Sequence, residues 1–115
     1  MIVHSGGVEL YAEDHYPEEQ GAYPEAQGTP VLLLHGWPDS SALWRHQVLF
    51  LTAHGFRVIT PDLRGFGRSD RPEGVTAYSL QKAVSDVVGI LDAFDIVSDA
   101  KLNATGRDFC QIWCD

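Results

Sequence analysis

The chain has 115 residues, with 16 acidic and 8 basic side chains and a formal net charge of -8. This length fits one domain, and a composition of 44% hydrophobic and 21% charged residues excludes a disordered or fibrous protein. The acidic balance argues against a nucleic-acid binder, since phosphate affinity needs clustered Lys and Arg, and no apolar run approaches the roughly 18 residues of a membrane span.

The first part of the chain predicts two strands separated by a loop. Residues 8–15 (VELYAEDH) roughly alternate apolar and polar side chains, as a half-exposed strand does. Residues 17–30 are rich in Pro, Gly and acids without periodicity, which predicts a loop. The unbroken apolar run 31–34 (VLLL) is typical of a strand buried between two layers of helices, as in a parallel sheet.

A helix and a further strand are expected next. Ser40 or Ser41 can cap the helix at its start, and Gly55 ends it. The apolar stripe of this helix comprises Leu43, Trp44, Val48 and Leu51. Residues 57–60 (RVIT) predict a second short buried strand, which a loop rich in Gly and Arg follows.

A second helix is predicted from Tyr78 or Ser79 to Phe94, and its apolar residues recur every three to four positions. Its single buried face is expected to comprise Leu80, Ala83, Val84, Val87, Val88 and Leu91. Strand, helix, strand, helix is the βαβ order of an open α/β sheet. After Ile96 the pattern breaks: no run of four apolar residues follows, so no further strand is expected there.

The residues that carry most chemical interest are His35, Gly36, Trp37 and Pro38, at the carboxyl end of a buried strand, where open α/β sheets bind ligands. Gly36 permits a sharp turn, and Pro38 favours an extended Trp37 whose backbone N–H is left without an acceptor. Such an N–H can stabilise a developing oxyanion and so lower the activation barrier by ~3–4 kcal/mol. On these four residues alone, a plain strand-to-helix turn is the alternative.

The segments HGWPDSSALWRHQ (35–47) and GFRVITPDLRGFGRSDRP (55–72) together resemble the α/β-hydrolase superfamily, in the branch of epoxide hydrolases and haloalkane dehalogenases. The resemblance covers roughly residues 8–96, about the first third of such an enzyme. It implies that the backbone N–H of Trp37 contributes to an oxyanion hole and that Trp37–Pro38 is a candidate cis peptide. His35, Gly36 and Pro38 are then residues that shape the turn or bind substrate.

Within that branch, haloalkane dehalogenases typically carry Asn after the His-Gly pair, where this chain has Trp37, so the resemblance favours epoxide hydrolases. It further implies that the loop after the second buried strand is structural rather than catalytic. The matching loop residues are Asp62, Arg64, Gly65, Gly67, Ser69 and Asp70.

The catalytic groups of such enzymes cannot be assigned in this chain. They are a nucleophile on a strand-to-helix elbow, a His with an acid that orients it, and two lid tyrosines. We therefore expect a partial α/β-hydrolase sheet with flanking helices, truncated before the nucleophile elbow. Residues 1–96 form the N-terminal part of that domain, and residues 97–115 are a divergent tail, hypothesised to be a non-native extension. The chain alone is expected to be inactive.

Other motif interpretations are weaker. Ser69 lies in GRSDR, which lacks the second Gly of a nucleophile elbow, and the GFGRSD segment lacks the third Gly of a dinucleotide fingerprint. Arg64, Arg68 and Arg71 could grip a phosphate, but solvation or pairing with acids such as Asp62 and Asp70 is the simpler interpretation.

Metal and cofactor sites are not expected. His4, His15, His46 and His54 show no metal spacing, and Cys110 and Cys114 have no second pair that would complete a zinc signature. The start of the chain lacks a secretory signal pattern, so the cytoplasm is the expected compartment.

Two functions of different classes follow. In the first, the chain is part of an epoxide-hydrolase-like enzyme that adds water to a small apolar epoxide through an ester on an Asp absent here. In the second, it is a non-catalytic binding or interaction protein built on the half-sheet, able to self-associate through an unpaired sheet edge. A dehalogenase relative and a small esterase using Ser69 are further alternatives.

Overall fold

The computed structural model describes residues 1–16, 29–94, 96 and 111–114. Its elements in chain order are β1 (Ile2–Ser5), β2 (Val8–His15), β3 (Thr29–Leu34), the short 3-10 helix η1 (Ser41–Trp44), α1 (Arg45–Ala53), β4 (Phe56–Pro61), the 3-10 helix η2 (Val75–Tyr78), α2 (Leu80–Ala93) and β5 (Gln111–Cys114). None of the helices that the structure describes is long and apolar enough to cross a membrane.

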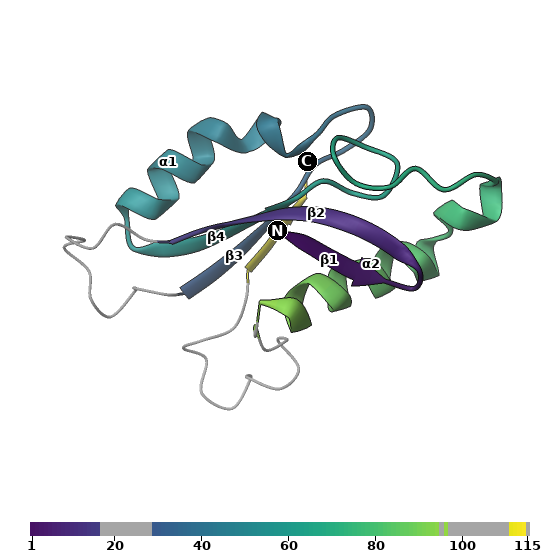
Figure 1. Cartoon of the computed structure of the whole chain (residues 1–115). Coiled ribbons are helices and arrows are strands. Elements are labelled where there is room, and N and C mark those ends of the chain that lie inside the picture. The colour runs from purple at the N-terminus through teal and green to yellow at the C-terminus, as the bar shows by residue number, and fades with distance from the viewer. Residues whose placement is uncertain (17–28, 95, 97–110, 115) are drawn as a thin grey trace.

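The strands form one mixed sheet in the order β1-β2-β4-β3-β5 (Figure 1). β1 pairs with β2 and β2 with β4 in antiparallel fashion, whereas β4 and β5 both lie parallel to β3. The chain therefore leaves β3, passes through α1 and returns beside it as β4, which is the predicted βαβ connection.

β3 is buried on both faces, as its apolar run predicts. Leu32 packs in one core with Ile59 of β4 and with residues of β1, β2 and α2. Val31 and Leu33 point to the opposite face, where they pack with Trp44 and other residues of η1 and α1. Because successive strand side chains alternate between faces, one strand serves both cores, and α1 and α2 cover opposite faces of the sheet.

Most predicted strands agree with the structure to within two residues. β2 has the predicted bounds, β3 begins two residues before its apolar run, and β4 is one residue longer at each end. β1 was not predicted. It is joined to β2 through Gly6 and Gly7, which both have positive φ, as a two-residue hairpin turn requires.

The first predicted helix is confirmed, but its first turn is the 3-10 helix η1, and the α-helix α1 begins only at Arg45. The Ser40 hydroxyl accepts a hydrogen bond from the backbone N–H of Ala42 and so caps the first turn. Gly55 follows the helix with φ of 90°, a conformation that glycine adopts without steric cost.

The predicted bounds of α2 are confirmed, but its predicted buried face is right only in part, since Leu91 is buried and Val87 packs against the core whereas the other predicted residues are exposed. Leu80, Val84 and Val88 are at least half exposed, and the buried residues of α2 are Asp86, Ile90 and Leu91. The exposed valines and leucine recur every four residues, so they form a separate apolar stripe that turns away from the sheet. Periodicity alone could not distinguish the two stripes, and the polar contacts of Asp86 described below select the face that is buried.

The absence of a strand after residue 96 is also contradicted. β5 lies parallel to β3 and continues the sheet, with Leu32 in register with Ile112. A strand pairs through its backbone groups and does not require four consecutive apolar residues, and Ile and Trp both favour strands. The edge of β3 that does not pair with β4 is thus occupied. Cys110 and most of the segment 97–115 lie outside the described residues.

Candidate active site

The turn formed by residues 35–38 directly follows β3, at the carboxyl end of the parallel strands. His35 is buried, with 3% of its surface exposed, whereas the Trp37 side chain is 83% exposed. The Trp37–Pro38 peptide is cis, as the family resemblance implied. Among the described residues, no oxygen accepts a hydrogen bond from the Trp37 N–H.

His35 connects this turn to the loop that follows β4. The backbone N–H of Leu63 donates to His35 Nε2 over 2.9 Å, so this ring nitrogen carries no proton. The proton therefore lies on Nδ1, which donates to the carbonyl oxygen of Gly36 over 2.9 Å. The Phe66 ring meets the imidazole edge to face at a centroid distance of 5.4 Å. The ring is thus held in one tautomer and one orientation.

Asp62, at the end of β4, is a buried carboxylate that organises two loops. Its Oδ1 accepts the backbone N–H of Ser41 over 2.7 Å, and its Oδ2 accepts that of Arg68 over 3.1 Å. Burial raises the pKa of Asp62, but the hydrogen bonds from Ser41 and Arg68 outweigh burial and hold the pKa below its ordinary value. Asp62 therefore remains ionised and ties the start of η1 to the Gly-rich loop.

Close contacts with neighbouring side chains require glycine at two positions of this loop, 65 and 67. Gly65 has φ of 88°, and a Cβ there would lie 2.8 Å from Cε1 of Tyr78. Gly67 has φ of 54°, and a Cβ there would collide with the Asp62 carboxylate. The positive φ values alone disfavour any other residue, and the contacts leave no room for one. The loop thus passes closely over its neighbours, Tyr78 and Asp62.

Ser69 and Asp70 make structural contacts. The Ser69 hydroxyl donates to the Asp62 carbonyl and accepts the backbone N–H of Tyr11 over 2.8 Å. A carbonyl oxygen cannot serve as a general base, so this geometry does not activate Ser69 as a nucleophile. The Asp70 carboxylate accepts the backbone N–H of Glu9 over 2.8 Å. Both residues fix the loop against β2.

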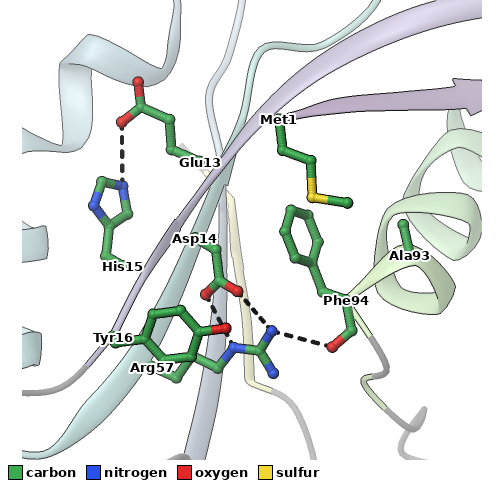
Figure 2. Close-up of a pocket in the computed structure, with 8 residues that line it drawn as sticks. All are labelled: Met1, Glu13, Asp14, His15, Tyr16, Arg57, Ala93 and Phe94. Carbon is green, nitrogen blue, oxygen red and sulfur yellow. Dashed lines mark hydrogen bonds and ion pairs between the residues drawn. The ribbon is translucent and has the colours of Figure 1, made fainter.

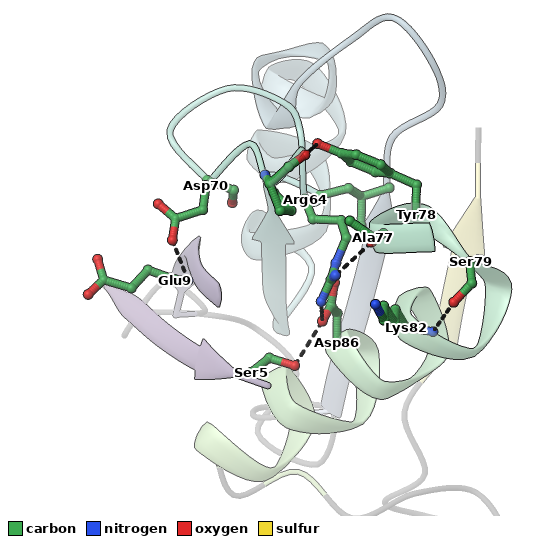
Figure 3. A network of polar contacts seen from close by, with 12 residues as sticks. Ser5, Glu9, Arg64, Asp70, Ala77, Tyr78, Ser79, Lys82 and Asp86 are labelled. Carbon is green, nitrogen blue, oxygen red and sulfur yellow. Dashed lines mark hydrogen bonds and ion pairs between the residues drawn. The ribbon is translucent and has the colours of Figure 1, made fainter. Parts of the chain in front are cut away.

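A buried ion pair beneath the loop was missed by sequence reasoning (Figure 3). Arg64 donates to both carboxylate oxygens of Asp86, from Nε over 2.6 Å and from Nη2 over 2.7 Å, and its Nη1 donates to the Ala77 carbonyl. Ser5 Oγ donates to Asp86 over 2.8 Å. The hydrogen bond with Asp86 raises the pKa of Arg64. The signal in the sequence was an acidic residue, Asp86, on the face of a helix that also carries Ile90.

The other two arginines are exposed, as the simpler interpretation expected, but they do not pair with Asp62 or Asp70. The Arg68 guanidinium lies 3.3 Å from Glu13 and 4.5 Å from the ring centroid of Tyr11. Arg71 donates to the Gly67 carbonyl over 3.3 Å. None of the three arginine side chains pairs with the carboxylates of Asp62 or Asp70 within the described residues, because those carboxylates are used by backbone N–H groups.

A cavity of about 550 Å³ opens beside the turn at residues 35–38. It is lined by Trp37, Leu63, Arg64, Gly65, Phe66, Tyr78, Ser79, Ala83 and Asp86. Aromatic and aliphatic side chains form much of its wall, and the polar side chains of Arg64 and Asp86 already bind each other. A volume of this size with an apolar wall suits a small apolar molecule.

Comparisons with known proteins agree with this geometry. Residues 29–102 match the sequence pattern of the family described as alpha/beta hydrolase fold. The chain belongs to the alpha/beta hydrolase fold family. The predicted family and fold class are thereby confirmed.

Two curated proteins and one solved structure illustrate what this chain is similar to. Epoxide hydrolase B of Mycobacterium tuberculosis is 46% identical over 93 residues, which are 81% of this chain and 24% of that protein. A haloalkane dehalogenase of Psychrobacter cryohalolentis is 46% identical over 84 residues, covering 73% of this chain and 25% of that protein. A crystal structure of an epoxide hydrolase from Vigna radiata has a TM-score of 0.72 at 32% identity, covering 85% of this chain and 29% of that one.

The chain thus spans about a quarter of the length of these curated relatives, rather than the expected third. Both curated proteins belong to the branch that the motifs resemble. The likeness to epoxide hydrolases is therefore established for this segment of the alpha/beta hydrolase fold.

A second, larger cavity of about 620 Å³ lies at the opposite end of the strands, near the start of β4, and lacks the turn motif (Figure 2). Its lining residues are Met1, Glu13, Asp14, His15, Tyr16, Arg57, Ala93 and Phe94. Arg57, near the start of β4, pairs with Asp14 over 2.7 Å and donates to the Phe94 carbonyl over 3.1 Å. Because ligands of α/β sheets bind at the carboxyl ends of the strands, size does not make this cavity the candidate active site.

Two histidines outside the turn, His15 and His54, lie within hydrogen-bond distance of neighbouring residues. His15 Nε2 lies 2.9 Å from the Thr60 hydroxyl. His54 follows α1, and its Nδ1 lies 2.7 Å from the Phe50 carbonyl near the end of that helix. Within residues 1–16, 29–94, 96 and 111–114, no group of three His, Cys, Asp or Glu side chains could hold a metal ion.

Proposed function

We propose that this chain is the N-terminal portion of an epoxide-hydrolase-like enzyme that adds water to a small apolar epoxide. An aspartate from another part of that enzyme attacks a carbon of the epoxide, and the C–O bond to that carbon breaks while a lid tyrosine of the same enzyme gives a proton to the ring oxygen. The covalent ester formed on the aspartate is then hydrolysed by water. The observation that carries the proposal is the Trp37 N–H, which lies beside an apolar cavity at the carboxyl end of β3 without an acceptor among the described residues. We keep the predicted cytoplasmic location as part of the proposal.

Each residue of the turn has a separate role in this proposal. Attack of water on the ester places negative charge on the former carbonyl oxygen, and the Trp37 N–H donates a hydrogen bond to that oxyanion. The exposed Trp37 ring forms one wall of the cavity and contacts the apolar substrate. Gly36 and Pro38 give the backbone the turn that directs the N–H toward the cavity.

The test replaces the matched 93 residues of Epoxide hydrolase B of Mycobacterium tuberculosis with the matching residues of this chain. We call this protein the exchange enzyme. We expect it to hydrolyse a small apolar epoxide, whereas the 115-residue chain alone shows no turnover above background. A folded exchange enzyme without epoxide hydrolysis would refute the proposed function.

Two substitutions at one position separate the backbone N–H from the indole ring. Trp37→Pro removes the N–H, and we expect it to lower kcat of the exchange enzyme about 100-fold or more, as loss of one oxyanion donor does. Trp37→Ala keeps the N–H but removes the cavity wall, so it raises KM and lowers kcat less than about 10-fold. Steady-state kinetics with thermal melting of each variant provides the measurement. Equal loss of kcat in both variants contradicts the role of the N–H.

A dehalogenase is the second candidate, because a haloalkane dehalogenase matches 73% of this chain at 46% identity. The presence of Trp37 after His35-Gly36 favours an epoxide, since the family resemblance gives dehalogenases Asn at this position. Halide release from a small haloalkane by the exchange enzyme, at a rate exceeding that of epoxide hydrolysis, would favour this alternative.

A non-catalytic binding or interaction protein is a candidate of another class, favoured by the apolar cavity of about 550 Å³. In this alternative the chain binds a small apolar ligand beside Trp37 without turnover, or self-associates through β5, which pairs only with β3 among the described strands. Calorimetric binding of an apolar ligand by the 115-residue chain, and its mass in solution, test both possibilities.

A further inference from the structure

We infer that His35 is a positioning residue for the Trp37 N–H, through the peptide group that joins Gly36 to Trp37. This inference rests on the proposed function, because it concerns the same oxyanion donor. The Gly36 carbonyl and the Trp37 N–H belong to one planar peptide group, in which they point in opposite directions. Whatever fixes the carbonyl therefore fixes the direction of the N–H.

Two donors hold the Gly36 carbonyl. His35 Nδ1–H donates to it over 2.9 Å, and the backbone N–H of Asp39 donates over 3.1 Å. Rotation of the peptide plane would break both hydrogen bonds at once. The Trp37 N–H therefore points away from both donors and is free of acceptors among the residues that the structure describes.

His35 is itself fixed from the neighbouring strand. Its Nε2 accepts the backbone N–H of Leu63, its ring lies against Phe66, and only 3% of its surface is exposed. A neutral imidazole with its proton on Nδ1 satisfies the Leu63 donor and the Gly36 acceptor together, and the other tautomer satisfies neither. The imidazole thus connects the loop after β4 to the Gly36–Trp37 peptide group, so the position of that loop helps to fix the orientation of the peptide group beside the cavity.

Two conservative substitutions separate the two hydrogen bonds of His35. The amide nitrogen of Asn can stand near Nδ1, so His35→Asn keeps a donor for the Gly36 carbonyl and loses the acceptor for Leu63. The amide oxygen of Gln can stand near Nε2, so His35→Gln keeps the acceptor and loses the donor. His35→Ala removes both.

In the exchange enzyme we expect kcat to fall about 10-fold or more for His35→Gln and His35→Ala, with partial rescue in His35→Asn. KM should fall together with kcat, and kcat/KM should change less than about twofold, because the donor acts on hydrolysis of the ester, after the ring-opening step that sets kcat/KM. Thermal melting of each variant provides the stability control. If kcat instead follows the melting temperature, with Asn no better than Gln at equal stability, His35 has a merely structural role and the inference is wrong.

A spectroscopic test on the 115-residue chain needs no activity. Nitrogen NMR of the labelled histidine should show the proton on Nδ1, and the Leu63 amide should show a coupling to Nε2 across the hydrogen bond. A proton on Nε2 overturns the inference even if the exchange enzyme hydrolyses epoxides. Conversely, an inactive exchange enzyme with the expected His35 tautomer refutes the proposed function and leaves the geometry of His35 intact.

Discussion

A buried carboxylate is stable in this fold because backbone N–H groups surround it. Asp62 accepts hydrogen bonds from Ser41 and Arg68, and Gly67 leaves the space that its carboxylate fills. A charged acceptor makes stronger hydrogen bonds than a neutral one, about 1.5–3 kcal/mol each. Asp62 therefore holds together the start of η1 and the loop after β4, the two segments beside the candidate active site.

The depressed pKa of Asp62 predicts a pH dependence of stability. Since the folded pKa lies below the ordinary value of 3.8, the ionised group stabilises the fold above pH 3.8, and this stabilisation is lost as pH falls through the folded pKa. We expect Asp62→Asn to cost about 1.5–3 kcal/mol at neutral pH. The difference in melting temperature between the native chain and the variant should shrink in acid.

Asp70→Asn is the matched control, because Asp70 is exposed and its carboxylate accepts one backbone N–H, that of Glu9. It should cost less than Asp62→Asn at every pH. Melting curves recorded from neutral pH to acid, monitored by circular dichroism, give the comparison. A constant difference between the native chain and Asp62→Asn across that range would show that the carboxylate charge does not matter.

At the scale of elements, the helices carry two kinds of apolar residue. Ile90 of α2 is fully buried against the sheet, whereas Val84 on the same helix is 55% exposed. Burial decides the cost of removing an apolar side chain, because only a buried one leaves a cavity. The face of α2 that meets the sheet is fixed by Asp86 and Arg64 as much as by apolar residues.

The pair Ile90→Ala and Val84→Ala tests this orientation. Both substitutions replace a β-branched residue by Ala within one helix, so their effects on helix propensity are similar. We expect Ile90→Ala to lower the free energy of unfolding by about 2–5 kcal/mol and Val84→Ala by about 0.5 kcal/mol or less. Urea denaturation measures both. Comparable costs would mean that α2 presents its valine stripe to the sheet instead.

These elements also show what the sequence could and could not predict. The apolar run that includes Leu32 and the cap at Ser40 are local signals, and the structure agrees with both. The turn at Trp37 was found because Gly36 and Pro38 restrict the backbone, whereas the glycines at 65 and 67 were found through the family resemblance. The partner of Arg64 could not be found, since Asp86 lies 22 residues away and only the packing of α2 on the sheet brings the two together.

β1 and β5 illustrate the same limit. A short strand such as Ile2–Ser5 has too few residues for a clear pattern, and its evidence lay in the Gly6-Gly7 turn instead. Gln111–Cys114 becomes a strand by pairing with β3, a contact distant in sequence. Local propensity is a weak predictor when the decisive interaction is tertiary.

At the scale of the whole molecule, the described residues form a sheet with a core on each face but leave apolar side chains of both helices uncovered. Leu49 and Phe50 of α1 are mostly exposed, as are Leu80 and half of the Val84 and Val88 surfaces on α2. Exposed apolar side chains at this density mark an interaction surface or a face that other parts of a longer protein cover.

This exposure predicts how the chain behaves alone. We expect the 115-residue chain to bind a hydrophobic dye under native conditions and to unfold with weak cooperativity, because its two small cores are incompletely covered. The exchange enzyme should bind little dye and unfold sharply, because it supplies the remaining three quarters of an alpha/beta hydrolase. Dye fluorescence and urea denaturation followed by two spectroscopic probes measure both properties.

The control for the dye is a variant of the same chain, Leu80→Ser with Val84→Ser, which removes part of the exposed stripe on α2 and leaves Ile90 and the buried face unchanged. It should lower dye fluorescence and change the melting temperature little. Coincident unfolding by both probes without dye binding would mean that the chain forms a complete, independently folding domain, because two-state unfolding is the behaviour of a small domain with a complete core. That result would favour the independent binding protein over the hydrolase portion.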